Sequence, residues 1–135
     1  MATVSKSFYD TPNRRGLVIG ILPCDESLKK PPDGYPNQWI EIPVLTHLPA
    51  SGERGTDPVS RNHINILSSD VIVALPGDGG TASEVELAVR YERPLIAFVE
   101  SDQEIPGLPS SVSISSSLQG VRKFVLAQLG LAPNS

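Results

Sequence analysis

Val71–Ala74 (VIVA) runs directly into Leu75–Glu84 (LPGDGGTASE), and Val85–Val89 (VELAV) follows with helical spacing. A short continuous apolar run bounded by glycine and proline is typical of a strand in a parallel sheet. A strand that passes through a glycine-rich turn into a helix is suited to bind a phosphate. Glycine lets the backbone approach an anion closely, and the N–H groups and dipole of the helix start favour negative charge.

The sequence therefore predicts an anion site in the turn between this strand and its helix. Its residues are Gly77, Asp78, Gly79, Gly80 and Thr81. We expect Thr81 to cap the helix Thr81–Glu92, with Glu84 three positions later completing a capping box. The Asp78 carboxylate would repel an anion unless it turns outward or a cation offsets it.

The rest of the chain predicts strands that alternate with helices. The run Leu17–Leu22 is typical of a strand covered on both faces. The run Trp39–Leu45 predicts a second, weaker strand, in which Pro43 indicates an edge or a bend. Asp57 before Pro58 favours a helix over 58–68, with Val59, Ile66 and Leu67 facing inward. The remaining predicted elements are a strand at Pro94–Val99, a short edge strand at Val112–Ile114, and a last helix with Leu118, Val121, Val125 and Leu129 on one face.

This alternation predicts an α/β fold with a mainly parallel sheet, in which ligands lie beyond the carboxyl ends of the strands. A length of 135 residues suits one domain over 1–135. The net charge of −4 gives no attraction to nucleic acid or to an anionic membrane. The single cysteine, Cys24, and the absence of an apolar leader favour the cytoplasm. We expect Arg14 and Arg15 to be solvated and His63 to lie on a helix surface.

The segment Pro76–Glu84 (PGDGGTASE) resembles the PGGxGTxxE motif of the "possible lysine decarboxylase" or Lonely Guy (LOG) superfamily. Arg61 precedes Glu84 by 23 positions (84 − 61), which is the offset of the family's arginine from its glutamate. Arg61–Asp70 (RNHINILSSD) is more similar to the molybdenum cofactor carrier proteins of this superfamily than to its nucleoside 5′-monophosphate phosphoribohydrolases. The resemblance covers about residues 15–100.

The resemblance implies a Rossmann-like three-layer fold and a homodimer or larger homo-oligomer. Family members begin with a βαβ portion, and Met1–Lys6 resembles the helix just after it, so we expect this chain to be shortened at its N-terminus. Asp78 stands where the family has its second glycine. Despite the superfamily's old label, lysine decarboxylation is not supported, because nothing marks a lysine for pyridoxal phosphate.

Three functions are compatible with these residues. The first is binding of a phosphorylated nucleotide or of the molybdenum cofactor at the turn, with Arg61 and Asn62 contributing and no resident metal ion. The second is hydrolysis of a nucleoside monophosphate to a free base, for which the resemblance implies Arg61 orienting the phosphate and Glu84 assisting cleavage. The third is a structural remnant that assembles and binds no ligand.

Overall fold

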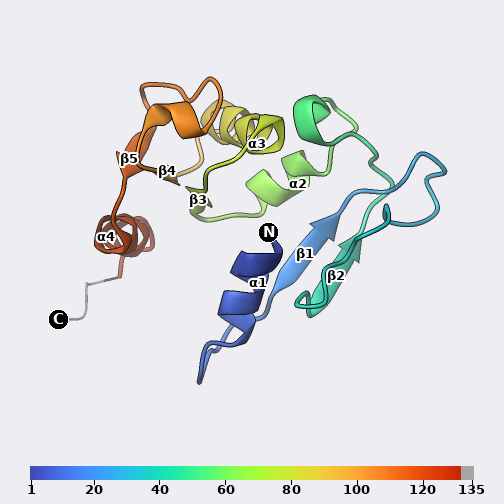
Figure 1. The fold of residues 1–135 in the computed structure, drawn as a ribbon, viewed down its shortest axis with the longest axis horizontal. Coiled ribbons are helices and arrows are strands. Elements are labelled where there is room, and N and C mark those ends of the chain that lie inside the picture. Colours follow the sequence, from blue (N-terminus) through green and yellow to red (C-terminus); the bar gives the residue numbers. More distant parts are fainter. Residues whose placement is uncertain (132–135) are drawn as a thin grey trace. The chain divides into compact units, whose positions relative to one another are not determined.

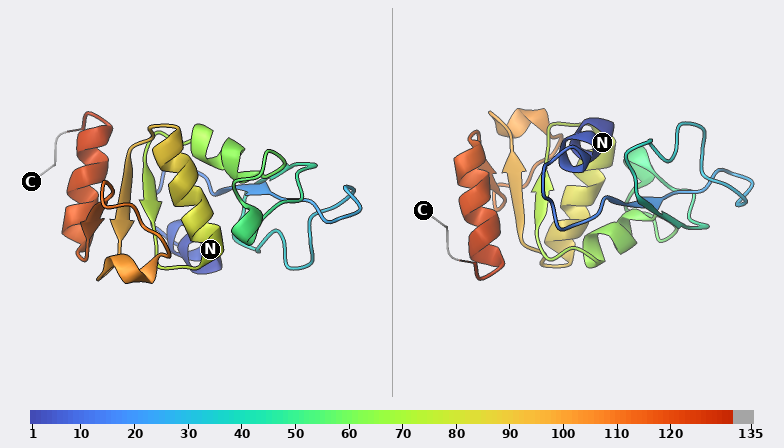
Figure 2. Two further views of the ribbon diagram at one scale, coloured as in Figure 1. Left: turned by 90° about the horizontal axis from the view of Figure 1, so that it is seen from above. Right: turned by 90° about the horizontal axis from the view of Figure 1, so that it is seen from below.

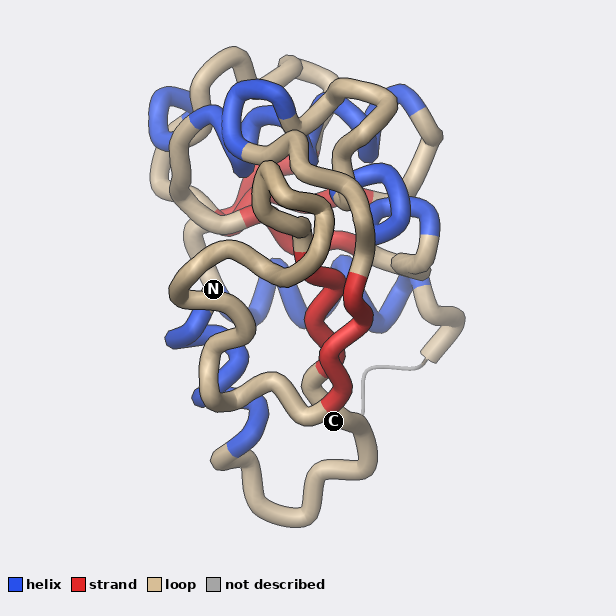
Figure 3. The backbone as a smooth tube through the Cα atoms, turned by 90° about the vertical axis from the view of Figure 1, so that its right-hand side faces the viewer, coloured by secondary structure: helices blue, strands red, loops and turns tan. Residues whose placement is uncertain are grey.

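The computed structural model describes residues 1–131. Within these residues the chain forms two compact units, one over Met1–Pro49 and one that begins at Ala50. Figure 3 shows that long loops connect short helices and strands. None of the helices within residues 1–131 has the length and apolar character needed to cross a membrane.

The second unit carries a parallel sheet of three strands in the order β3-β4-β5. Figure 1 labels these strands, and Figure 2 shows β3 and β4 side by side and running in the same direction. The strands are β3 (Ile72–Ala74), β4 (Leu95–Phe98) and β5 (Ser113–Ser115), and the helices are α2 (Asn62–Leu67), α3 (Gly79–Arg90) and α4 (Leu118–Gln128), with two 3-10 turns, η1 (Gly52–Arg54) and η2 (Asp102–Glu104). The predicted α/β class with parallel strands is confirmed, as is β5 at a sheet edge.

The core of this unit lies where α3 packs on the central strand β4. Leu87 and Ala88 on the inner side of α3 are fully buried, and so is Ala97 of β4. Burial of apolar side chains is the main contribution that favours folding, and here it determines which side of α3 faces the sheet.

The first unit consists of α1 (Ala2–Tyr9), β1 (Ile19–Leu22) and β2 (Ile42–Leu45). The two strands pair in parallel with Ile19 opposite Ile42. Both strands are shorter than predicted, and the expectation that the first is covered on both faces is wrong, because Ile19 is 59% exposed. The β-branched run was sufficient to predict a strand, but burial depends on neighbouring layers that the run itself does not contain.

Arg14 and Glu41 tie the loop before β1 to the loop before β2. The Arg14 guanidinium donates to both Glu41 oxygens, at 2.7 and 2.8 Å, and the Val18 amide donates to Glu41 at 2.8 Å. The Arg14 hydrogen bonds, followed by that of Val18, hold the pKa of Glu41 below its ordinary value. The expectation that Arg14 is simply solvated is therefore wrong; its guanidinium also lies over the ring of Tyr9.

Several predicted helix boundaries and burial patterns also differ. The helix predicted over 58–68 is α2, Asn62–Leu67, since Asp57 and Pro58 belong to a turn before it. Of its three predicted inward residues only Ile66 is buried, while Val59 and Leu67 are 44% and 46% exposed. In α4, Val121 is buried, whereas Leu118 is 72% exposed. Short amphipathic helices leave their end residues uncovered, which spacing alone does not reveal.

Leu87→Ala should lower the free energy of unfolding by about 2–5 kcal/mol, because it removes a fully buried side chain and leaves a cavity. Urea unfolding followed by circular dichroism measures this loss. The matched control is Leu118→Ala, since Leu118 is 72% exposed and should cost far less. Equal losses in the two variants would contradict the assigned core.

Glu41→Gln should make the free energy of unfolding depend less on pH in the acidic range. Folding lowers the pKa of Glu41, which means that the folded chain favours the ionised carboxylate. The stabilisation that Glu41 contributes is therefore complete above the ordinary carboxyl pKa and is lost as the pH falls through the lowered pKa. Urea unfolding at neutral pH and at a series of acidic values should show a smaller acid loss in Glu41→Gln than in wild type. Glu26→Gln, at an exposed carboxylate of the same unit, should leave the acid loss unchanged.

Candidate functional site

The glycine turn lies where it was predicted, between the carboxyl end of β3 and the start of α3. The Gly77 amide donates to the Glu104 carbonyl at 3.1 Å, so η2 holds the beginning of the turn. A Cβ atom on Gly77 would lie 2.2 Å from Thr81 Oγ1. The turn therefore requires glycine at this position, because the Thr81 side chain folds back over it.

Asp78, and not Thr81, caps α3. The Asp78 Oδ1 atom accepts a hydrogen bond from the Gly80 amide at 3.3 Å, which is the usual bond from an N-cap side chain to the second helical residue. Thr81 is the third residue of the helix, so the predicted capping box at Thr81 and Glu84 is wrong. The helix starts earlier because aspartate is among the strongest N-caps and two glycines do not prevent helical geometry.

Two amide donors of the first turn of α3 remain open. Within residues 1–131, the amides of Gly79 and Thr81 have no hydrogen-bond acceptor, whereas the Gly80 amide is taken by Asp78. Open N–H groups at a helix start, together with the helix dipole, are suited to an anion. Of the amides that the sequence predicted as donors, that of Gly77 is therefore taken by the Glu104 carbonyl and that of Gly80 by the Asp78 carboxylate, while those of Gly79 and Thr81 stay open.

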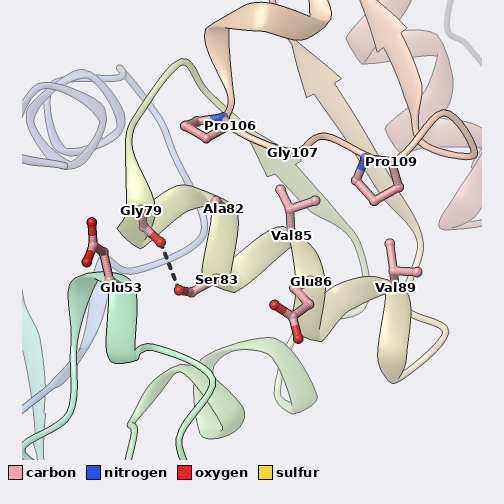
Figure 4. A pocket seen from close by; sticks show the side chains of 10 residues that line it. All are labelled: Glu53, Gly79, Ala82, Ser83, Val85, Glu86, Val89, Pro106, Gly107 and Pro109. Carbon is pink, nitrogen blue, oxygen red and sulfur yellow. Dashed lines mark hydrogen bonds between the residues drawn. The ribbon is translucent and has the colours of Figure 1, made fainter.

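The turn η1 packs directly on this first turn of α3. The Ser83 hydroxyl donates to the Gly52 carbonyl at 2.8 Å. A Cβ atom on Gly79 would lie 2.7 Å from Glu53 Cγ, and one on Gly55 would lie 2.6 Å from Ser83 Cβ. Figure 4 shows the Glu53 side chain beside Gly79. These glycines therefore let η1 approach α3 closely, and they bring a second carboxylate to the helix start.

The structure brings together Arg61 and Glu84, the two residues that the family resemblance implied for a hydrolase. Arg61 Nη1 lies 3.5 Å from Glu84 Oε1, and the two side chains are 19% and 29% exposed. Asn65 Nδ2 donates to the same oxygen at 3.2 Å. Asn65 was not among the predicted site residues, although its spacing of four from Arg61 already placed both on one side of the helix.

Asn62 and His63 have structural roles in this part of the chain. Asn62 is 4% exposed, and its Nδ2 lies where a Cβ atom on Gly55 would clash. The His63 ring contacts the Tyr91 hydroxyl at 2.7 Å and the Asp57 carbonyl at 2.9 Å. His63 lies on α2, as expected of a residue on a helix surface, but it is half-buried and its ring is bonded at both nitrogens.

A pocket of about 370 Å³ lies along the outer side of α3. Figure 4 shows its lining, in which Ala82, Val85 and Val89 of α3 face Pro106 and Pro109 of the loop before β5. The carboxylates of Glu53 and Glu86 stand at its rim, and no cationic side chain from residues 1–131 lines it. Arg61 and Glu84 do not contribute to this pocket, since Glu84 projects from the opposite side of α3.

Asp78→Ala should lower the free energy of unfolding by about 0.5–2 kcal/mol, because it removes the cap of α3. Asp78→Asn should lose much less, since asparagine caps a helix about as well as aspartate. Thermal and urea unfolding of the two variants measure the difference. If Thr81→Val proved the more damaging substitution, the cap would have been assigned to the wrong residue.

Comparison with known proteins places the chain in a family. A solved structure of the molybdenum cofactor carrier protein from Chlamydomonas reinhardtii matches with a TM-score of 0.55 and 28% sequence identity, over 85% of this chain and 63% of that one. The chain thus spans less than two thirds of that protein. No curated protein matches. The similarity confirms the Rossmann-like class and the resemblance to the LOG superfamily. With residues 1–122 matching the family's sequence model, the chain belongs to the SLOG cluster4 family.

Proposed function

We propose that this chain binds a phosphorylated small molecule, a nucleotide or a molybdopterin-type cofactor, with the phosphate at Gly77–Thr81. The observation that carries the proposal is the pair of open amides, on Gly79 and Thr81, at the start of α3 and at the carboxyl end of β3. The similarity to a protein named as a molybdenum cofactor carrier supports a binding role. The predicted homo-oligomer and the cytoplasmic location stay predictions.

The two carboxylates near the turn determine what the site accepts. Asp78 occupies the Gly80 amide, and Glu53 packs against Gly79. Each adds repulsion toward an anion, and within residues 1–131 no group of acidic, histidine or cysteine side chains is arranged to hold an offsetting metal ion. The site therefore favours one phosphate of low charge and binds it with modest affinity.

Hydrolysis of a nucleoside monophosphate is the second candidate, and the Arg61–Glu84 contact is the observation that favours it. In the present arrangement Arg61 and Asn65 both point to one oxygen of Glu84, so Arg61 is engaged with the carboxylate and not with the turn. A role for Arg61 in holding phosphate would require it to leave Glu84. This makes binding without cleavage the better supported function.

The experiment is a calorimetric titration of the full chain with inorganic phosphate and with GMP. We expect wild type to bind both, and Asp78→Asn to raise the affinity for each by about fivefold or more because one repelling charge is lost. Asp70→Asn, which removes an exposed carboxylate before β3, is the matched control and should change neither.

Two outcomes would count against this assignment. Absence of binding in both wild type and Asp78→Asn would leave the turn as a plain strand–helix connection. Chromatographic detection of free guanine after incubation with GMP, abolished by Glu84→Ala, would establish the hydrolase instead.

A further inference from the structure

We propose that the pocket along the outer side of α3 holds the ring of the ligand, and that this ring is a neutral heterocycle carrying amino groups. The inference rests on the proposed function, because it takes the phosphate to lie at the turn. It adds the chemical class of the remaining part of the ligand and the side of α3 on which that part lies.

The pocket is continuous with the phosphate turn. Gly79 provides an open amide to the turn and also lines the pocket. From Gly79 the pocket follows α3 past Val85, six residues or about 9 Å along the helix axis. A phosphate at the helix start therefore leaves the rest of its molecule at the mouth of this pocket.

The walls of the pocket suit a flat apolar surface. Val85 is buried, Val89 is 41% exposed, and Pro106 and Pro109 face them across the gap, as Figure 4 shows. A volume of about 370 Å³ falls within the range of about 300–1,000 Å³ found for small-molecule sites. A ring placed between the valines and the prolines would cover apolar surface on both of its faces.

The charged side chains around the pocket determine which chemical groups the ring should carry. Glu53 and Glu86 are acidic, Arg90 lies 2.7 Å from Glu86, and no cationic side chain lines the pocket itself. Carboxylates accept hydrogen bonds from N–H groups and repel further anions. Amino groups on the ring, as in guanine or a pterin, can donate hydrogen bonds to these carboxylates. Additional phosphates would be repelled by them.

The position of the ring has a chemical consequence. Glu84 projects from the opposite side of α3 and is held there by Arg61 and Asn65. A general acid–base residue must come within hydrogen-bond reach of the reacting atoms. With the ring in this pocket, the bond between ring and sugar lies on the far side of the helix from Glu84. The ligand is then bound and not cleaved.

The test compares three probes by calorimetry on the full chain: ribose 5-phosphate, GMP and GTP. GMP should bind about tenfold more tightly than ribose 5-phosphate, and GTP more weakly than GMP. Val89→Asn should reduce the affinity for GMP by about tenfold and leave that for ribose 5-phosphate unchanged, which also shows that the variant is folded. Val59→Asn is the matched control, because Val59 is 44% exposed and lies outside the pocket.

The outcomes separate this inference from the proposed function. If none of the three probes binds, the phosphate assignment fails and the ring assignment fails with it. If GMP binds but Val89→Asn and Val59→Asn behave alike, the phosphate assignment stands and the ring lies elsewhere. Release of free guanine by wild type would place the sugar within reach of Glu84 and overturn the inference.

Discussion

The close contact between η1 and the first turn of α3 is the constraint on which the rest of the candidate site depends. It requires that Gly55 has no side chain, it places the Glu53 side chain against Gly79, and the hydrogen bond from Ser83 to the Gly52 carbonyl holds it. Because η1 lies there, Glu53 stands at the rim of the pocket and next to the glycine turn. A larger residue at Gly79 would force the Glu53 side chain to move and so change the turn and the pocket together. A glycine-rich motif can thus serve internal packing and ligand approach at once.

Much of the secondary structure could be predicted from the sequence, because each of these elements depends on the residue types within a short segment. The strand before Gly77, the helix after it, and the edge position of β5 follow from apolar runs and turn residues. The spacing of Arg61 and Glu84 identified both as candidate site residues, but it did not predict that their side chains contact each other. The start of α3 was misplaced because Asp78 and Thr81 are both good caps, and local propensity does not choose between them.

The features that sequence reasoning missed depend on contacts between distant residues. Glu53 meets Gly79 across 26 positions (79 − 53), and Arg14 meets Glu41 across 27 (41 − 14). The pocket beside α3 exists only because the loop containing Pro106 and Pro109 returns to the same helix. Nothing in the intervening sequence specifies these approaches, since they arise from how the core positions the helix and its loops. The glycines were the available signal, but glycine alone does not identify its partner.

The edge strand β5 has a consequence for how the protein behaves at high concentration. It is only three residues long, Ser113–Ser115, with serines at both ends, and within residues 1–131 it pairs only with β4. A short strand with polar ends offers few backbone groups to a strand from another molecule. This side of the sheet is thereby protected against the edge-to-edge growth that starts β-aggregation.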